Sequence, residues 1–424
     1  MERQYIDSDI SWVGKIPDNW SVLRNKNTFI CRKDLVGEKS SSTQLLSLTT
    51  KGIRAIKQGE TSGKVPDSYD TYQIVNPNNL VMCLFDLDCS AVFSGISPYC
   101  GMISPAYKVL SCKNIIIPKF ADYWFTYVFD GRKFMHYSKN IRYSLTYDEF
   151  SALRIVVPPI CEQQHIADYL DDKCGEIDSL IGLQEQMIER LKAYKQGVIT
   201  EAVTKGLNPN AKLVPSGIEW TGEIPEGWKV TKIKSIAKTN SGSTPRNISG
   251  SEYSTIIWIR TTDINDDIVV DSSLHLTIEE YASASCPMLD KGACVVAMYG
   301  GGGTIGKSGY LDCHATINQA LCSMEVSNMY DSKYLFCVLR AIRYYWMKFA
   351  VGTRKDPNIN QEIVKNMIVP LPPLEQQQAI ASYLDEKCAD IDRLIAMKQQ
   401  KIEKLKDYKK SVIYEAVTGK INIE

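Results

Sequence analysis

The sequence contains few of the residues from which metal sites and histidine-based active sites are built. It has four histidines, His136, His165, His275 and His314, and none has a partner at the spacing of metal ligands. Its thirteen cysteines never form a Cys-x-x-Cys pair and stand singly among apolar residues, so we interpret them as reduced core thiols. The sequence therefore predicts neither a metal site nor a catalytic residue.

Long hydrophobic runs and an excess of charge are also missing. No apolar stretch is long enough to cross a bilayer, and the first ten residues do not resemble a signal sequence, so we expect a cytoplasmic protein without membrane contact. The 49 basic residues balance the 49 acidic ones. A net charge of zero argues against unaided nucleic-acid binding over a large surface, unless charge is segregated or partner subunits supply it.

What the sequence does contain is a repeat. Residues 158–204 and 372–418 align without a gap at roughly 60% identity. A shorter pair precedes them: the box from Trp12 to Trp20, WVGKIPDNW, returns from Trp220 to Trp228 as WTGEIPEGW. Each unit therefore reads as a Trp-Ile-Pro-Trp box, a variable segment and a long polar helix, and the chain is a tandem duplication.

The segments between the repeated elements, about residues 21–157 and 229–371, show little detectable similarity to each other. Candidate strands at residues 44–48, 80–84, 106–110, 155–157, 256–259, 294–298 and 368–371 alternate with helical stretches at 120–135 and 332–349. We expect an α+β protein with a pseudo-twofold internal repeat, in which two unlike mixed α/β domains at 1–157 and 209–371 are joined by conserved helices at 158–208 and 372–424. Two different targets read from one frame is the natural interpretation.

The two repeated helices have the heptad pattern of an antiparallel coiled coil. Its seam consists of Leu170, Ile177, Leu191 and Val198 in the first helix and Leu384, Ile391, Leu405 and Val412 in the second. Gln184 and Lys398 occupy the same seam register, and a polar residue there excludes slipped pairings. We expect a second row to complete the seam, formed by Ile166, Leu180, Met187 and Tyr194 in the first helix and Ile380, Leu394 and Tyr408 in the second. Further apolar residues, Ile181, Ile188, Ile395 and Ile402, are expected to widen the apolar stripe so that further helices dock on it.

One motif could be mistaken for nucleotide chemistry. Residues 301–308, GGGTIGKS, match the phosphate-binding loop pattern G-x-x-x-x-G-K-[ST]. A phosphate-binding loop must open a helix, whereas the following residues 309–317 alternate and are rich in β-branched side chains. We therefore favour a glycine-rich hairpin with Lys307 at its tip, where the backbone can approach another surface.

These residues resemble the specificity subunits of type I restriction-modification systems over nearly the whole chain. The resemblance lies in the box at 220–228, the run PLPPLEQQ at 370–377 that opens a long helix, and Gly303-Thr-Ile-Gly-Lys307 followed by Asn318-Gln319. It implies two target-recognition domains that each read one half of a bipartite site in double-stranded DNA, with paired helices that set the spacer and dock two methyltransferase subunits. Restriction subunits can join the complex, and S-adenosylmethionine, ATP and Mg are expected on the partner subunits rather than on this chain.

By motif, only loop positions of the second domain can be carried over from the family, because the first domain has LFDLD at 84–88 where the second has its glycine-rich run. We nominate as DNA contacts Thr304, Lys307 and Arg354 in the second domain and Lys139 and Arg142 in the first. Arginine and lysine in such positions either bind phosphate or read guanine in the major groove.

Two other functions stay open at this point. The chain could be a coiled-coil adaptor that binds proteins only, which salt-sensitive DNA binding would exclude. It could also be an ATP-dependent enzyme that uses the loop at 301–308, which replacement of Lys307 by alanine would test. In addition, the exposed apolar width of the helices predicts self-association when the partners are missing.

Overall fold

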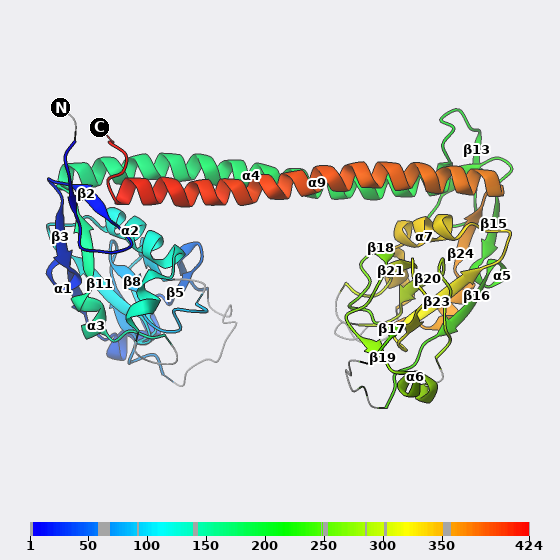
Figure 1. Ribbon diagram of the computed structural model, residues 1–424, viewed down its shortest axis with the longest axis horizontal. Helices are drawn as coiled ribbons and strands as arrows, with labels where there is room; N and C mark the ends of the chain where they lie inside the picture. The colour runs from blue at the N-terminus through cyan, green and yellow to red at the C-terminus, as the bar shows by residue number, and fades with distance from the viewer. Residues whose placement is uncertain are drawn as a thin grey trace. The chain divides into compact units, whose positions relative to one another are not determined.

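The computed structural model describes residues 3–57, 68–90, 93–138, 143–246, 248, 253–284, 286–300, 303–350 and 358–423. The chain forms two compact units. The first consists of residues Met1–Glu185 and Gln400–Glu424, and the second of residues Gln186–Gln399. Each unit therefore combines one globular domain with part of each long helix (Figure 1).

The first domain is built on an antiparallel sheet with the strand order β4-β11-β8-β9. Helix α2 (Pro118–Asp130) packs on β9 and buries Trp124 and Phe125 against Phe29 of β4 and Leu110 of β11. Large buried aromatic side chains of this kind supply most of the hydrophobic stabilisation of a small core. The strands of the sheet are β4 (Phe29–Arg32), β8 (Leu80–Met82), β9 (Ser94–Ile96) and β11 (Lys108–Cys112).

The second domain repeats this arrangement. Its sheet has the order β16-β23-β20-β21-β18, in which the first four strands are antiparallel and β18 (Asp267–Val269) adds a parallel edge. Helix α7 (Ser332–Ala341) packs on β20 and β21, as α2 packs in the first domain. The corresponding strands are β16 (Ala237–Ser241), β20 (Cys294–Ala297), β21 (Ser308–Leu311) and β23 (Leu321–Val326).

The expected pair of mixed α/β domains is confirmed, and the two share one core topology although their sequences show little similarity. Strand pairs also close each domain in the same way: β3 (Ser21–Arg24) pairs with β12 (Arg154–Val157), and β15 (Lys229–Lys232) pairs with β24 (Ile368–Leu371). A short helix follows the first strand of each pair and another precedes the second strand. These helices are α1 (Asn25–Thr28) and α3 (Tyr147–Ala152) in the first domain, and α5 (Ile233–Ile236) and α8 (Gln361–Asn366) in the second.

The remaining elements are short and lie around these cores. The first domain adds β1 (Tyr5–Asp7), β2 (Lys15–Pro17), η1 (Gly37–Ser42), β5 (Leu46–Thr49), β6 (Gly52–Ala55), β7 (Gln73–Val75), β10 (Gly101–Ile103) and η2 (Lys133–Tyr137). The second adds β13 (Leu213–Pro215), β14 (Glu223–Pro225), β17 (Ile256–Ile259), β19 (His275–Leu276), α6 (Ile278–Ala284), β22 (Thr316–Ile317) and η3 (Tyr345–Lys348). The strands expected near 80–84, 155–157, 256–259, 294–298 and 368–371 are confirmed.

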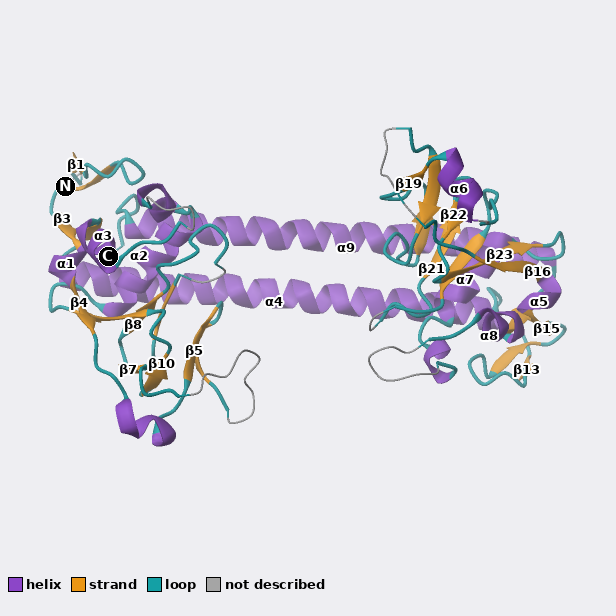
Figure 2. Cartoon of the chain, turned by 90° about the horizontal axis from the view of Figure 1, so that it is seen from below, coloured by secondary structure: helices purple, strands orange, loops and turns teal. Residues whose placement is uncertain are grey.

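The long helices are α4 (Ile160–Lys205) and α9 (Leu374–Val417). In each unit, a segment of one runs antiparallel to a segment of the other (Figure 2). Seam residues Leu170, Ile177, Leu384, Ile391 and Val412 are buried, while Leu191, Val198 and Leu405 are half-buried. Within the described part of the chain, no helix is both long enough and apolar enough to cross a membrane.

The second row of the seam differs from the expectation. Ile166 and Ile380 are buried, but the other residues of this row, Leu180, Met187, Tyr194, Leu394 and Tyr408, are exposed. The inner row is formed instead by residues four positions after the first row, because Leu170 and Cys174, like Leu384 and Cys388, pack into the domain cores and so fix how each helix is rotated about its axis. This inner row consists of Cys174, Ile181, Ile188, Cys388, Ile395 and Ile402.

A buried glutamine fastens the first turn of each long helix to its domain. The Gln163 amide donates to the carbonyls of Ile115 and Pro158 at 2.9 and 2.8 Å, and its Oε1 accepts the Ile117 N–H at 2.8 Å. In the second unit, Gln377 donates to the Pro372 carbonyl at 2.8 Å and accepts the Asp331 N–H at 2.7 Å. Both side chains are completely buried, so each forms a satisfied polar link inside the core.

Equivalent ion pairs hold the second helix of each domain against the long helices. Lys119 of α2 pairs with Asp171 of α4 at 2.9 Å, and Lys333 of α7 pairs with Asp385 of α9 at 2.6 Å. The Trp-Ile-Pro-Trp boxes add a further link, since the Trp20 indole N–H donates to Glu162 at 2.9 Å and that of Trp228 to Gln376 at 2.8 Å. The repeated sequence elements thus form the joint between domain and helices.

Candidate nucleic-acid interface

The glycine-rich residues 303–307 belong to a β-hairpin. Strands β20 and β21 pair antiparallel on either side of them, and no helix follows. A phosphate-binding loop needs a helix that begins directly after it, so that the helix N-terminus can bind the phosphate. These residues are followed by a strand, and they therefore do not form an ATP-binding loop. The Lys307 carbonyl accepts the Ala297 N–H at 2.8 Å, so Lys307 stands at the base of the hairpin and not at its tip. Gly301 and Gly302 lie outside the described residues.

Arg343, just beyond the end of α7, is hydrogen-bonded to the backbone of this loop. Its guanidinium donates to the carbonyls of Gly303 and Ile305, and its Nε donates to Asp266 at 3.0 Å. Asp266 in turn accepts the backbone N–H and the hydroxyl of Ser308 at 2.8 and 3.0 Å. The arginine residue is only 9% exposed, so these bonds form away from water, where they are worth most.

Gly306 makes the close approach of this loop possible. Its φ is +77°, and a Cβ there would lie 2.4 Å from Cδ1 of the buried Trp346 and 2.7 Å from the Arg343 carbonyl. Any side chain would collide with the indole, and the backbone conformation itself favours glycine. The glycine in the sequence motif thus serves loop packing rather than phosphate binding.

In the first domain, an arginine binds the equivalent hairpin loop in the same way, although the loop sequence is different. Residues 83–90 connect to β8, and Arg132, just beyond the end of α2, donates to the carbonyls of Leu87 and Ser90 at 2.7 and 3.0 Å. The arginine is also stacked over the Phe129 ring at 4.4 Å. Arg132 and Arg343 therefore occupy equivalent places in the two domains and bind equivalent hairpin loops.

A second shared contact ties each hairpin to the segment before α3 or α8. The Leu145 N–H donates to the Leu84 carbonyl at 2.7 Å, and the Ile359 N–H donates to the Met298 carbonyl at 2.8 Å. In the first domain, the Leu87 N–H also donates to the Tyr143 carbonyl at 3.1 Å. The nominated DNA contacts Lys139, Arg142 and Arg354 belong to these same stretches of chain, at positions outside the described residues.

The two loops present different chemistry. Half-buried Thr304 and Lys307 stand on the second loop. The first loop carries Asp86, whose φ is +51°, and the exposed Asp88. One loop thus offers lysine and threonine as hydrogen-bond donors and the other offers carboxylate acceptors, so the two domains present different chemistry from equivalent places on a shared core.

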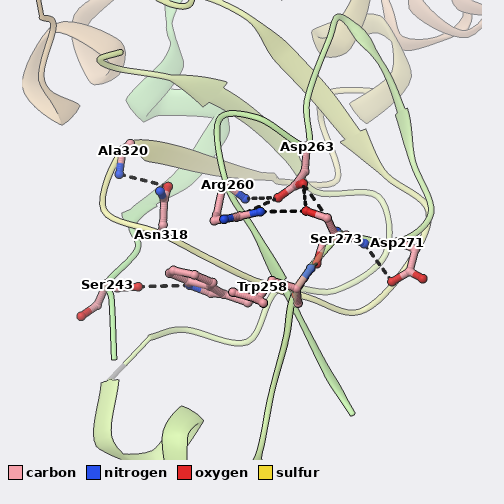
Figure 3. Close-up of polar contacts among 10 residues, drawn as sticks. Ser243, Trp258, Arg260, Asp263, Asp271, Ser273, Asn318 and Ala320 are labelled. Atoms are coloured by element: carbon pink, nitrogen blue, oxygen red, sulfur yellow. Dashed lines mark hydrogen bonds and ion pairs between the residues drawn. The ribbon is translucent and has the colours of Figure 1, made fainter. Parts of the chain in front are cut away.

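Another ordered arginine lies beyond β17 in the second domain. Arg260 donates to the Ser273 hydroxyl at 2.7 Å, and its Nε lies 3.5 Å from the Asp263 carboxylate (Figure 3). Ser273 completes the triangle by donating to Asp263 at 2.7 Å. The loop from Arg260 continues to Asp266, which binds Arg343, so the Arg260 cluster and the hairpin are connected through one short segment.

The Asn318-Gln319 signature shapes a turn. The Asn318 side chain accepts the Ala320 N–H at 3.2 Å, and its backbone N–H donates to the Ile259 carbonyl at 3.0 Å (Figure 3). Gly242 packs so tightly here that a Cβ would lie 1.9 Å from the Ile317 carbonyl oxygen. These motif residues therefore organise the turn before β23, and Trp258 adds a bond from its indole to the Ser243 carbonyl at 3.2 Å.

The helix pair has one apolar and one ionic flank in each unit. Asp178 and Asp392 directly follow seam residues, and each pairs with a lysine of the other long helix: Lys409–Asp178 at 2.7 Å in the first unit and Lys195–Asp392 at 2.6 Å in the second. Residues that directly precede a seam position are apolar and exposed on the opposite flank. They are Leu180, Leu183 and Tyr408 in the first unit, and Met187, Tyr194, Leu394 and Met397 in the second.

The role of Arg132 and Arg343 cannot be read from the sequence, because the carbonyls that they bind come from loops distant in the chain. Among the described residues, no group of three or more His, Cys, Asp or Glu side chains is arranged to hold a metal ion.

Comparison with known proteins agrees with this architecture. A family model described as the type I restriction modification DNA specificity domain matches residues 225–407. The MjaVIII specificity subunit of Methanocaldococcus jannaschii is 27% identical, over 83% of this chain and 81% of its own length. The EcoBI specificity subunit of Escherichia coli is 22% identical, over 100% of this chain and 90% of its own.

Solved structures share the fold. A chain from a study of complex assembly and conformational transition in the type I R-M system superposes with a TM-score of 0.73 at 14% identity, covering 96% of this chain and 99% of its own. The HsdS subunit from Thermoanaerobacter tengcongensis gives a TM-score of 0.51 at 14% identity, covering 96% and 98%. In its family-model match and in these relatives, the chain is similar to the specificity subunits of type I restriction-modification systems, and it shares their fold.

Proposed function

We propose that this chain reads a bipartite site in double-stranded DNA, one half with each globular domain, and supplies no catalysis itself. The observation that carries the proposal is the recurrence of one core fold with equivalently held hairpin loops that differ in chemistry. A shared core with divergent loops is how a protein scaffold reads different targets. The interpretation as a protein-only adaptor gives no reason for these loops.

The long helices have two roles in this proposal. Their buried seam fixes the pairing of α4 with α9, and the paired helices set the spacer between the two half-sites. The apolar flank of each unit is the surface on which one methyltransferase subunit docks, since exposed apolar patches of this kind mark protein interfaces. Because the flank residues recur in both units, two copies of the methyltransferase are expected.

The chemistry of modification and cleavage belongs to partner subunits. S-adenosylmethionine for methyl transfer, and ATP with Mg for a restriction subunit, would bind there. The near-neutral chain then gains part of its affinity for phosphate from those partners, because each neutralised phosphate releases counterions and adds to salt-dependent binding.

The test is to co-express the chain with its methyltransferase partner and map methylated adenines in the host DNA by long-read sequencing. The proposal predicts methylation at a single motif with two defined halves and an unspecified spacer, and salt-sensitive binding of the purified complex to that motif. A stable complex that methylates no motif and binds DNA without salt dependence would instead favour the adaptor.

A further inference from the structure

In the described part of each domain, an arginine donates from its guanidinium to two backbone carbonyls of a hairpin loop. In the second domain, Arg343 reaches two carbonyls of the β20–β21 loop and the carboxylate of Asp266. In the first, Arg132 reaches two carbonyls of the loop after β8. Both residues come directly after the helix that covers the central sheet.

A guanidinium in such a place is costly unless it is paired. Removing an arginine from water is unfavourable, and only well-formed hydrogen bonds offset that cost. A hydrophobic residue could fill the space at Arg343 without this cost, but it could not donate hydrogen bonds to the carbonyls of Gly303 and Ile305. The arginine therefore fixes the conformation of a loop that has no regular secondary structure of its own.

The arginine–carbonyl contact occurs in both domains although their loops differ in sequence. The two loops share no sequence motif, since one is LFDLD and the other GTIGK. Their glycine content, their charge and the carbonyls that they offer all differ. What the two domains share is an arginine at one place in the fold, and a backbone hydrogen bond to the start of the loop from the residue two positions before α3 or α8.

We propose that Arg132 and Arg343 are positioning residues for base recognition, each holding the hairpin loop of its own domain in the conformation that presents its side chains to DNA base edges. This rests on the proposed function above. The loop side chains then set the half-site: carboxylates such as Asp88 accept from the amino groups of cytosine or adenine, and Lys307 donates to guanine.

The test uses the complex of the full chain with its methyltransferase, once its methylation motif is known. Arg343→Lys keeps the charge but cannot bind two carbonyls and a carboxylate at once, and Arg132→Lys does the same in the first domain. Arg340→Lys on α7 and Arg154→Lys on β12 are matched controls, because neither contacts a hairpin loop. Binding is measured on duplexes with single substitutions in each half-site.

The expected result is a loss of discrimination of about tenfold, the size of one mismatched base pair, in one half-site only. Arg343→Lys affects the half read by the second domain, Arg132→Lys affects the other half, and binding to non-specific DNA at low salt stays unchanged. A purely structural role would lower the denaturation temperature and weaken all binding alike, without a change in the ratio between cognate and substituted sites.

A further variant tests the same contact in case Arg343→Lys does not fold. Asp266→Asn removes the carboxylate that braces Arg343 but keeps a residue that tolerates the positive φ of 61° at this position. It is expected to weaken discrimination in the same half-site as Arg343→Lys. Unchanged discrimination in all three variants would overturn the proposal while leaving the proposed function intact, whereas a wild-type complex with no bipartite motif would overturn the proposed function itself.

Discussion

Two glycines of the β20–β21 loop differ in what surrounds them. Both have positive φ, +86° at Gly303 and +77° at Gly306, but a Cβ at Gly303 meets nothing within 4 Å, whereas at Gly306 it meets Trp346 and the Arg343 carbonyl. Alanine at Gly303 is expected to cost about 1 kcal/mol of backbone strain. Alanine at Gly306 is expected to cost about 3 kcal/mol or more, because the indole must move.

Thermal or urea denaturation of the two variants checks this difference. If Gly303→Ala and Gly306→Ala lose the same stability, the tight packing of the loop on Trp346 is not what requires the glycine. The sequence indicated a close backbone approach at this run, and the structure shows which of its glycines makes it.

A buried carboxyl in the first domain predicts a dependence on pH. Burial raises the pKa of Asp122 to about 6, against the opposing effects of Lys119 and of the Ser94 hydroxyl, which donates to it at 3.4 Å. The folded state thus binds the proton more tightly than the unfolded chain, whose pKa is 3.8. This stabilisation is fully present below the unfolded pKa and is lost as the pH rises through about 6.

The variant Asp122→Asn removes the titration. It is expected to be more stable than the wild type by about 2 kcal/mol at pH 8, and to keep only a small part of that advantage at pH 4.5. Urea denaturation at the two pH values measures the difference. If the variant and the wild type differ in stability by the same amount at both pH values, the Asp122 carboxyl is not desolvated in the folded state.

Residue roles were the least predictable part of the sequence. Lys307 and Thr304 were located by a motif, but the arginines that hold the loops were not, since their partners are backbone carbonyls without a sequence signature. The motif glutamines illustrate the same limit. They mark the start of a helix in the sequence, and only the fold shows that Gln163 and Gln377 are buried links.

At the scale of elements, those two glutamines give a direct prediction. Alanine at Gln163 or Gln377 leaves a buried carbonyl and a buried N–H without partners, so each variant is expected to lose about 3 kcal/mol of stability. The neighbouring Gln164 and Gln378 are exposed, and alanine there is expected to change stability by less than about 0.5 kcal/mol. Denaturation of the four variants tests whether the links are equivalent, and a small loss at either buried position would contradict it.

The apolar flanks of the helix pair yield a second element-scale prediction. Leu180→Lys and Leu394→Lys change equivalent exposed positions in the two units, and each is expected to remove one methyltransferase subunit from the complex. The double variant should remove both and also abolish self-association of the isolated chain. Lys192→Ala and Lys406→Ala, on exposed helix positions that pair only with Glu189 and Glu403, are matched controls.

Sedimentation or mass photometry measures the stoichiometry. If the leucine variants keep two methyltransferase subunits, docking does not use this flank. The heptad pattern predicted the pairing of the helices and five of its eight seam residues are fully buried, but it assigned the second row to the wrong side. The rotation of each helix is set by its packing on the domains, which a heptad count does not include.

At the scale of the whole molecule, the repeat in the sequence was visible only where the two halves meet the helices. The variable segments concealed a common topology, because strand order and hairpin position are kept by hydrophobic pattern while the residues themselves diverge. Two domains with one fold and two sets of loop residues are what a reader of a bipartite site requires.

The most direct test of this account is to replace residues 229–371 by residues 21–157, so that one domain is present twice on the unchanged helices, and to map adenine methylation in cells that also contain the methyltransferase. The account predicts a motif made of two copies of the half-site read by the first domain, with the other half lost. Retention of the original bipartite motif by a folded, methyltransferase-bound variant would contradict it.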